Sequence, residues 1–398
     1  MKNLETLIQE LCPDGVEFVK FKDCCDYIRG ITYNKSKEEN NSDAPAWKVL
    51  RANNITLSNN QLNFNDVKRV SIEVKVKESQ KLKKGDILIC AGSGSKDHIG
   101  KVAYIEDDVD YTFGGFMAVI RSTSVNTRFL FHILTGSSFK LYLSLALNSS
   151  TINNLNSSVM GNFEFPLPPI EVQTEIVRIL DKFTSLEAEL EAELDCRKRQ
   201  YEYYRDKLLS FDNVGGQEVE WKTLGELAEI GTGSSNTKDG LSEGLYPFYT
   251  RGQEVLRKNE YEFDDEAIIT AGDGVGVGKV IHYVKGKYAL HQRAYRFKPG
   301  DLLNARFLYF YMTSTFYKYV CGNSVSSSVS SLRKPRLLKY PIPLLPMQEQ
   351  IRIVSILDRF ESLTTSLQSG LPAEIAARRE QYEHYRDKLL TFKRKGAA

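Results

Sequence analysis

Apolar and polar positions follow a helical period along residues 165–211. Large apolar residues recur at steps of three and four and charged residues fill the opposite face, which is typical of a coiled-coil seam. One step departs from this alternation, because four residues separate Leu190 from Leu194 directly after another step of four, and such a stutter locally unwinds a supercoil. About 40 helical residues extend roughly 60 Å, which is too long for one helix on a single globular core. The seam positions are Ile176, Ile179, Phe183, Leu186, Leu190, Leu194, Tyr201, Tyr204, Leu208 and Phe211, with Arg197 in the slot between Leu194 and Tyr201.

The same pattern returns near the C-terminus, so the chain contains an internal repeat. Phe360 follows Phe183 at an offset of 177 residues, and beyond Leu363 the offset grows to 181. The extra residues coincide with Ser369-Gly370-Leu371-Pro372, and glycine and proline so close together end or kink a helix. We therefore predict one unbroken helix in the first copy and a broken one in the second. The second seam contains Ile353, Ile356, Phe360, Leu363, Leu367, Ile375, Tyr382, Tyr385, Leu389 and Phe392.

The segments that precede each helical copy also match, though more weakly. Val16 to Phe21 parallels Val219 to Leu224, and Asp86 to Gly94 parallels Glu266 to Gly274. Their β-branched runs, interrupted by glycine, predict strands and hairpins. We predict an α+β fold with a pseudo-two-fold internal repeat, in which two mixed α/β domains are separated by two long helices packed as an antiparallel coiled coil. The predicted segments are residues 1–165, 166–211, 212–341 and 342–398, the last broken near 369–372.

The loops of the two domains do not match. Residues 31–80 are longer and richer in asparagine than their counterpart around 234–260. A shared scaffold with different loops is what we expect of two modules that bind different targets.

Composition is that of a soluble globular protein, with 41% hydrophobic and 26% charged residues in 398. No apolar run approaches the ~18 residues of a membrane span, and the N-terminus has no apolar signal core, so we expect a cytoplasmic protein. The net charge of +2 argues against a chain that coats nucleic acid through bulk charge, so any basic surface must be local. The six cysteines form no CxxC pair, and we expect no metal site.

Catalytic motifs are not convincing. The glycine run from Gly272 to Lys279 lacks the spacing of a phosphate-binding loop, which would need glycine at the position of Asp273 and Ser or Thr at that of Val280. A strand, tight turn and strand explains it better. No metalloprotease motif or nucleophile–base pair is present, so we expect a chain without catalytic activity.

Polar loop residues are candidates for DNA contact. Arginine pairs well with guanine edges, and asparagine or glutamine with adenine edges, in the major groove, whereas lysine and arginine also hold phosphates without reading sequence. Taken singly, each is more often an ordinary surface residue. The candidates are Arg51, Asn53, Asn54, Lys96, His98, Arg251, Gln253, His291, Gln292, Arg293, Arg333 and Lys334.

The duplicated element resembles that of the specificity (S) subunits of type I restriction-modification systems. It has the form P-x-x-P-x-x-x-Q-x-x-I-V-x-I-L-D, from Pro166 to Asp181 and again from Pro343 to Asp358. The resemblance covers nearly the whole chain. It implies that residues 1–165 and 212–341 are target recognition domains, each reading one half of a split double-stranded DNA target, while the helices act as a ruler for the gap between the halves.

The resemblance also implies partners and cofactors. Two methyltransferase subunits would dock on the helices, and restriction subunits would join in the full assembly. This chain would bind no cofactor itself, since S-adenosylmethionine, ATP and Mg would belong to the partner subunits. The residues expected to join the helices to each other or to a partner are Ile176, Ile179, Phe183, Leu186, Tyr201, Tyr204, Leu208, Ile353, Ile356, Phe360, Leu363, Tyr382, Tyr385 and Leu389.

Two alternatives are open at this point. The chain could be a DNA-recognition subunit of a related methylase or nuclease outside type I, or an assembly scaffold that does not bind DNA. A scaffold would tolerate charge reversal in the loops around 51–54, 92–98 and 291–293 without loss of function.

Overall fold

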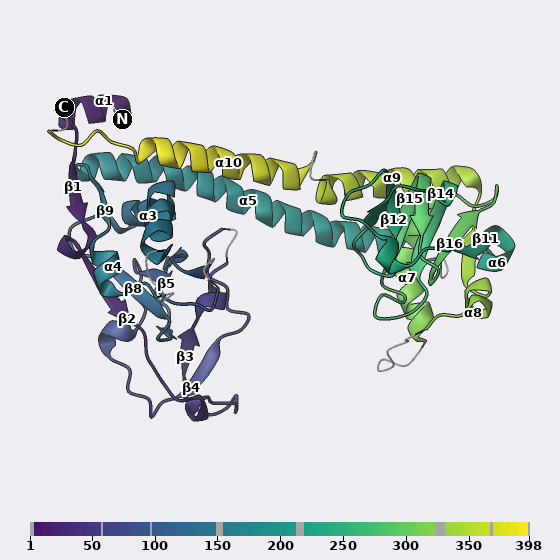
Figure 1. Ribbon diagram of the computed structural model, residues 1–398, viewed down its shortest axis with the longest axis horizontal. Helices are drawn as coiled ribbons and strands as arrows, with labels where there is room; N and C mark the ends of the chain where they lie inside the picture. The colour runs from purple at the N-terminus through teal and green to yellow at the C-terminus, as the bar shows by residue number, and fades with distance from the viewer. Residues whose placement is uncertain are drawn as a thin grey trace. The chain divides into compact units, whose positions relative to one another are not determined.

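The computed structural model describes residues 4–56, 59–95, 98–148, 154–211, 219–322, 331–366 and 369–396, and it divides into two compact units (Figure 1). Unit 1 comprises Met1–Glu189 and Ile375–Ala398, and unit 2 comprises Leu190–Glu374. Each unit therefore contains one of the segments that precede the helical copies, together with part of both copies.

Unit 1 contains a four-stranded sheet in the order β2-β8-β5-β6, a three-stranded sheet β4-β3-β7 and a separate pair β1-β9. Its strands are β1 Glu17–Lys20, β2 Cys25–Arg29, β3 Ala46–Leu50, β4 Lys68–Ser71, β5 Ile87–Cys90, β6 Val102–Tyr104, β7 Thr112–Phe113, β8 Met117–Ser122 and β9 Glu164–Leu167. Its short helices are α1 Leu4–Leu11, α2 Thr127–Thr135, α3 Ser137–Asn148 and α4 Ser157–Gly161.

Unit 2 repeats this arrangement in a six-stranded sheet, β11-β16-β14-β15-β12-β13, and a separate pair β10-β17. Its strands are β10 Glu220–Thr223, β11 Ala228–Thr232, β12 Tyr246–Tyr249, β13 Leu256–Lys258, β14 Phe263–Ala271, β15 Ile281–Leu290, β16 Ala294–Pro299 and β17 Pro341–Leu344. Its short helices are α6 Leu224–Leu227, α7 Ala305–Cys321 and α8 Lys334–Leu338. Strand β15 pairs with β14 as β6 pairs with β5, and it pairs with β12 as β7 pairs with β3. Because one strand makes both pairings, unit 2 has one sheet where unit 1 has two.

The strand pairing shifts the alignment of residues 86–94 with residues 266–274 by one residue. β5 pairs with β8 through Ile87 and Ile120, and β14 pairs with β16 through Ile268 and Phe297. Ile87 is therefore equivalent to Ile268, and the loops that follow align Gly92 with Asp273 rather than with Gly272. Two isolated bridges agree with this register, since they join Gly92 to Asn154 and Asp273 to Ser331.

The long helices are α5 Ile170–Leu208, α9 Met347–Thr365 and α10 Leu371–Leu389. The first copy is thus a single helix, and the second is divided between α9 and α10. Gly370 lies at this division with φ +94°, and an added Cβ would come within 2.8 Å of the carbonyl oxygens of Ser362 and Leu363. A side chain is therefore strained at this position.

Within unit 1, α5 and α10 run antiparallel. Phe183 stacks on Tyr385 with ring centroids 5.5 Å apart, and Glu187 forms an ion pair with Arg379. Within unit 2, α5 contacts α9 where Tyr204 stacks on Phe360 at 5.7 Å. Two sheet-containing units and contact between α5 and α10 confirm the predicted fold class.

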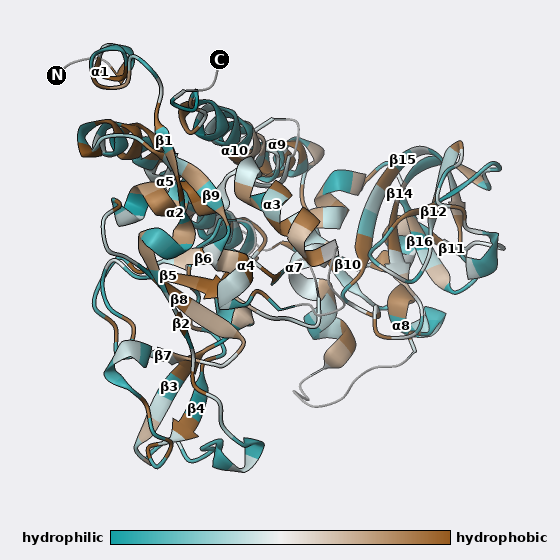
Figure 2. Ribbon diagram, turned by 60° about the vertical axis from the view of Figure 1, so that its left-hand side comes forward, coloured by the Kyte–Doolittle hydropathy of each residue, from teal (hydrophilic) through white to brown (hydrophobic). Residues whose placement is uncertain are grey.

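The helices also bury a second face against the domains. Val172, Ile176 and Leu180 of α5 belong to the core of unit 1, and Ile353 and Leu357 of α9 belong to the core of unit 2. Figure 2 shows that α10, in contrast, is largely hydrophilic.

Among the described helices no single one is long and apolar enough to cross a membrane; only the bent pair α2 and α3 together reaches that length and composition.

Candidate nucleic-acid interface

Each unit has a hollow where two parallel strands end. In unit 1, β3 and β7 pair in parallel, with Leu50 beside Phe113. In unit 2, β12 and β15 pair in parallel, with Tyr249 beside Leu290. Parallel strands end at the same edge of a sheet, so the loops that follow them lie together.

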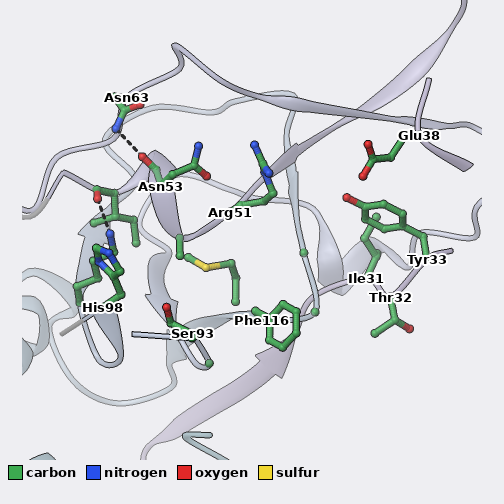
Figure 3. A pocket seen from close by; sticks show the side chains of 18 of the residues that line it. Ile31, Thr32, Tyr33, Glu38, Arg51, Asn53, Asn63, Ser93, His98 and Phe116 are labelled. Carbon is green, nitrogen blue, oxygen red and sulfur yellow. Dashed lines mark hydrogen bonds between the residues drawn. The ribbon is translucent and has the colours of Figure 1, made fainter. Parts of the chain in front are cut away.

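The hollow of unit 1 is a cavity of ≈ 1050 Å³, shown in Figure 3. Of the candidates predicted in this domain, Arg51, Asn53 and His98 line it. Its other polar and aromatic lining residues include Thr32, Tyr33, Glu38, Asn63, Ser93, Lys101 and Phe116. Lys96, the remaining basic candidate, lies outside the described residues.

Asp66 organises the Arg51 side of this cavity. Its Oδ2 accepts hydrogen bonds from Arg51 Nη2 at 2.7 Å and from Asn53 Nδ2 at 3.0 Å. Asn54 is fully buried; its Oδ1 accepts from the Arg51 backbone N–H, and its Nδ2 donates to the carbonyls of Asn63 and Asp66. Asn54 therefore shapes the loop, while Arg51 and Asn53 lie at the cavity.

Two buried nitrogens of this cavity have no hydrogen-bond partner among the described residues, namely Arg51 Nε and His98 Nδ1. A buried polar atom without a partner costs free energy. Both residues line the cavity, but these two atoms are themselves shielded from solvent.

The hollow of unit 2 measures ≈ 420 Å³ and is far more polar. Asp273 lies beside it, with Oδ1 accepting from Arg251 Nη1 at 2.8 Å and Oδ2 from Arg293 Nη1 at 3.0 Å. Burial alone would raise the pKa of Asp273, but the hydrogen bonds and charges of the two arginines outweigh it and lower that pKa. The carboxylate thus stays ionised and holds two guanidinium groups from different loops. The lining residues are Asn236, Thr237, Lys238, Arg251, His291, Gln292 and Arg293.

The other candidates of unit 2 lie in different surroundings. His291 is buried, and its Nδ1 accepts from the backbone N–H of Arg293 at 3.0 Å, so it supports the turn. Gln292 is exposed at the cavity and donates to Asn236 Oδ1 at 2.5 Å. Gln253 is exposed. Arg333 and Lys334 lie at the start of α8, outside the cavity, where Lys334 Nζ donates to the carbonyl of Ile230.

The repeated glutamine attaches each domain to its helix. Gln173 Oε1 accepts from the Asn126 backbone N–H at 2.9 Å, and Gln350 Oε1 accepts from that of Asn304 at 2.8 Å. Asn126 and Asn304 are the N-caps of α2 and α7. The sequence element is thus explained by one duplicated contact.

The repeated aspartate makes a second duplicated contact. Arg128 Nε donates to Asp181 Oδ1 at 2.9 Å, and Arg306 Nε donates to Asp358 Oδ1 at 2.7 Å. Both arginines lie in the first turn of α2 or α7, and both aspartates lie on α5 or α9. An arginine held by a carboxylate fixes direction as well as distance, so each domain is oriented on its helix.

Unit 1 adds a buried histidine to this contact. His132 Nε2 lies 2.9 Å from Asp181 Oδ1, and Nδ1 lies 2.9 Å from Tyr382 Oη. Burial lowers the pKa of His132, although Asp181 opposes this shift; the charges of Arg128 and Arg386 also lower it. The neutral imidazole then donates to Asp181 and accepts from Tyr382, which links α2, α5 and α10.

Replacing His132 by phenylalanine, the residue of the equivalent position 310 in unit 2, is expected to reduce the pH dependence of stability. The folded pKa of His132 lies below the unfolded value of about 6.5, so the unfolded chain binds the proton first and wild-type stability falls as pH drops below about 6.5. Urea unfolding of unit 1 at about pH 7.5 and about pH 5.5 measures this, with Trp47 fluorescence as the probe in a Trp221→Phe background. Equal pH dependence in wild type and His132→Phe would contradict it.

The expected docking residues lie in different surroundings. Ile176 and Ile353 are buried in the domain cores. The helix-to-helix contacts involve Phe183, Tyr201, Tyr204, Phe360 and Tyr385. Leu186 and Leu363 are exposed. Partly buried against the cores are Ile179, Leu208, Tyr382 and Leu389, and Ile356 is of intermediate exposure.

Sequence reasoning missed the residues that hold or face the arginines. Asp66 gave no signal because its partners Arg51 and Asn53 are distant in the sequence. Asp273 gave none because the sequence alignment matched Gly92 with Gly272 instead of with Asp273. Phe116 could have been noticed, because a large aromatic residue directly after Gly114-Gly115 sits in a turn.

Among the described residues, no group of three or more His, Cys, Asp or Glu side chains could hold a metal ion.

Comparison with known proteins identifies the family. Residues 13–195 and 217–377 match the type I restriction modification DNA specificity domain. The specificity subunit of the EcoR124I/EcoR124II type I restriction enzyme of Escherichia coli is 36% identical over 249 residues, which are 57% of this chain and 61% of that protein. The chain thus spans less than two thirds of this relative.

Solved structures agree on the fold. The S subunit of a type I restriction-modification system from M. genitalium aligns with a TM-score of 0.54 at 15% identity, covering 94% of this chain and 96% of that one. A chain from a study of complex assembly and conformational transition of the type I R-M system aligns with a TM-score of 0.60 at 17% identity, covering 95% and 98%. The chain belongs to the family of type I restriction-modification DNA specificity (S) subunits.

Proposed function

We propose that this chain reads a bipartite double-stranded DNA target, with residues 1–165 binding one half and residues 212–341 the other. One observation carries the proposal: both domains collect arginine and amide side chains at the carboxyl ends of the same pair of parallel strands. Arginine and amide groups are those that read base edges in the major groove. The different lining of the two cavities favours two different half-sites.

In this proposal the helical segments 166–211 and 342–398 set the distance between the half-sites and carry the partners. Methyltransferase subunits dock there, and restriction subunits join the full complex. Exposed apolar side chains on the helices support such docking, since large ones are rarely left uncovered in groups; they are Leu186, Tyr203, Tyr204, Leu363 and Tyr385. S-adenosylmethionine, ATP and Mg act on the partner subunits, and this chain contributes recognition rather than catalysis.

Removing the basic side chains tests DNA binding. With Arg51, Lys96, Arg293 and Arg333 changed together to alanine, the complex with its methyltransferase subunits is expected to bind target DNA at least about tenfold more weakly. The slope of log affinity against log salt should also decrease by about one for every side chain that contacts a phosphate.

A matched variant controls for net charge. It replaces Lys84, Lys140, Lys285 and Lys298 by alanine, four exposed lysines outside both cavities. Its affinity is expected to stay close to wild type. Equal affinities of the wild type and the variant with Arg51, Lys96, Arg293 and Arg333 replaced, at every salt concentration, would contradict DNA recognition by these residues.

A further inference from the structure

One turn has the same backbone in both domains and a different side chain at its tip. The turn after β7 is closed by a hydrogen bond from Met117 N to Gly114 O at 2.7 Å, and the turn after β15 by one from Ala294 N to His291 O at 2.9 Å. Since Met117 and Ala294 also begin the equivalent strands β8 and β16, Phe116 is equivalent to Arg293.

The neighbouring loop confirms this equivalence. The backbone N–H of Ala91 donates to Phe116 O at 2.8 Å, and that of Gly272 donates to Arg293 O at 2.8 Å. The next residue in each loop is Gly92 or Asp273. The two positions therefore differ together: where the turn has arginine, the adjacent loop supplies the carboxylate that binds it, and where the turn has phenylalanine, the loop has glycine.

Both tip side chains extend into solvent. Phe116 is 74% exposed, the most exposed aromatic side chain among the described residues, and in Figure 3 it lies with Ser93 on one side of the cavity while Arg51 and Asn53 lie on the other. The Arg293 side chain is 63% exposed although Asp273 holds one of its nitrogens. Arginine has five N–H donors in a planar fork, so donors remain for a ligand in a direction that Asp273 fixes.

We propose that this turn tip is a specificity-determining position in each domain, with Phe116 contacting the methyl group of a thymine in one half-site and Arg293 hydrogen-bonding a guanine in the other. The inference rests on the proposed function. In the major groove, thymine presents a methyl group that suits an apolar side chain, and guanine presents O6 and N7 that suit arginine. Asp273 is then a positioning residue for Arg293, and Gly92 has no side chain to position Phe116 in the same way.

The test uses base analogues in the target duplex, once mapping of modified adenines has given the target sequence. Uracil in place of one thymine removes only the methyl group, and 7-deazaguanine in place of one guanine removes only the N7 acceptor. The complex of full-length chain and methyltransferase subunits is titrated with each singly substituted duplex. Wild type is expected to lose about fourfold affinity for uracil at one thymine of the first half-site, and about tenfold for 7-deazaguanine at one guanine of the second.

Alanine variants assign these losses to the two side chains. In Phe116→Ala the uracil penalty disappears and the deazaguanine penalty stays, whereas Arg293→Ala shows the reverse. Asp273→Asn is expected to reduce the deazaguanine penalty while leaving the uracil penalty unchanged, as a positioning residue should. Leu145→Ala, which removes an exposed apolar side chain of α3 away from the cavity, serves as the control and keeps both penalties.

Two kinds of result overturn the inference while leaving the proposed function intact. One is a split target whose analogue penalties are the same in wild type and in both alanine variants, or whose first half contains no thymine. The other is a variant that loses affinity equally for every duplex, since its side chain would then support the fold. If the wild-type complex has no sequence-specific target, the proposed function itself fails.

Discussion

Replacing Gln350 by leucine is expected to lower the free energy of unfolding of unit 2 by about 3 kcal/mol. Gln350 is fully buried. Its Oε1 accepts from the Asn304 backbone N–H at 2.8 Å, and its Nε2 donates to Leu302 O at 3.0 Å and Leu345 O at 2.8 Å. Leucine fills similar space but removes the partner of three backbone groups, and a buried group left unsatisfied costs about 1–3 kcal/mol.

The chain offers a specific probe for this measurement, because one of its two tryptophans lies in each unit. In a Trp47→Phe background, Trp221 of β10 alone reports urea unfolding of unit 2. Arg352→Ala is the control: it removes an exposed contact to Glu349 on the same helix and is expected to cost less than about 0.5 kcal/mol. A Gln350→Leu variant as stable as this control would show that the repeated glutamine does not hold the domain.

Replacing Arg296 by methionine is expected to destabilise unit 2 by about 3–5 kcal/mol. This buried arginine of β16 forms ion pairs with Asp265 and Glu229, and its Nε donates to Tyr288 Oη at 3.2 Å. Its guanidinium also lies over the Phe263 ring, 4.6 Å from the centroid. Methionine keeps the apolar stem but leaves the largely buried Asp265 without its cation, which is the costly part.

A double-mutant cycle separates this cost from lost packing. Adding Asp265→Leu to Arg296→Met removes the unpaired carboxylate, so the double variant should be more stable than Arg296→Met alone. The same Trp221 unfolding experiment measures both. Additive losses in the two single variants and the double variant would contradict a buried ion pair as the source of the effect.

The helical repeat could be predicted because the spacing of apolar residues can be read from the sequence without any knowledge of packing. Steps of three and four gave α5, and Gly370 with Pro372 marked the division between α9 and α10. The seam included residues that pair with the other helix, as Phe183 and Tyr385 show, and also Ile176 and Ile353, which pack in the domain cores. It did not separate this second buried face, where Val172 and Leu180 pack beside Ile176, because that core forms only in three dimensions.

The candidate site was less predictable, because the sequence does not show which polar loop residues are buried or which loop residues are equivalent in the two domains. Asn54 and His291 were grouped with surface residues, but both are buried and support their loops. Matching glycines aligned Gly92 with Gly272, whereas the strand ladders align it with Asp273. That shift concealed the carboxylate that holds Arg293, and with it the contrast between Arg293 and Phe116.

The most direct test of the account is to co-express this chain with its methyltransferase subunit in a host without adenine methylation, and to map modified adenines across the genome. The account predicts one split motif with a fixed gap, in which exchanging residues 212–341 for those of another family member changes one half only. A motif that changes in both halves, or no modification by a complex that assembles, would contradict two independent reading domains in this chain.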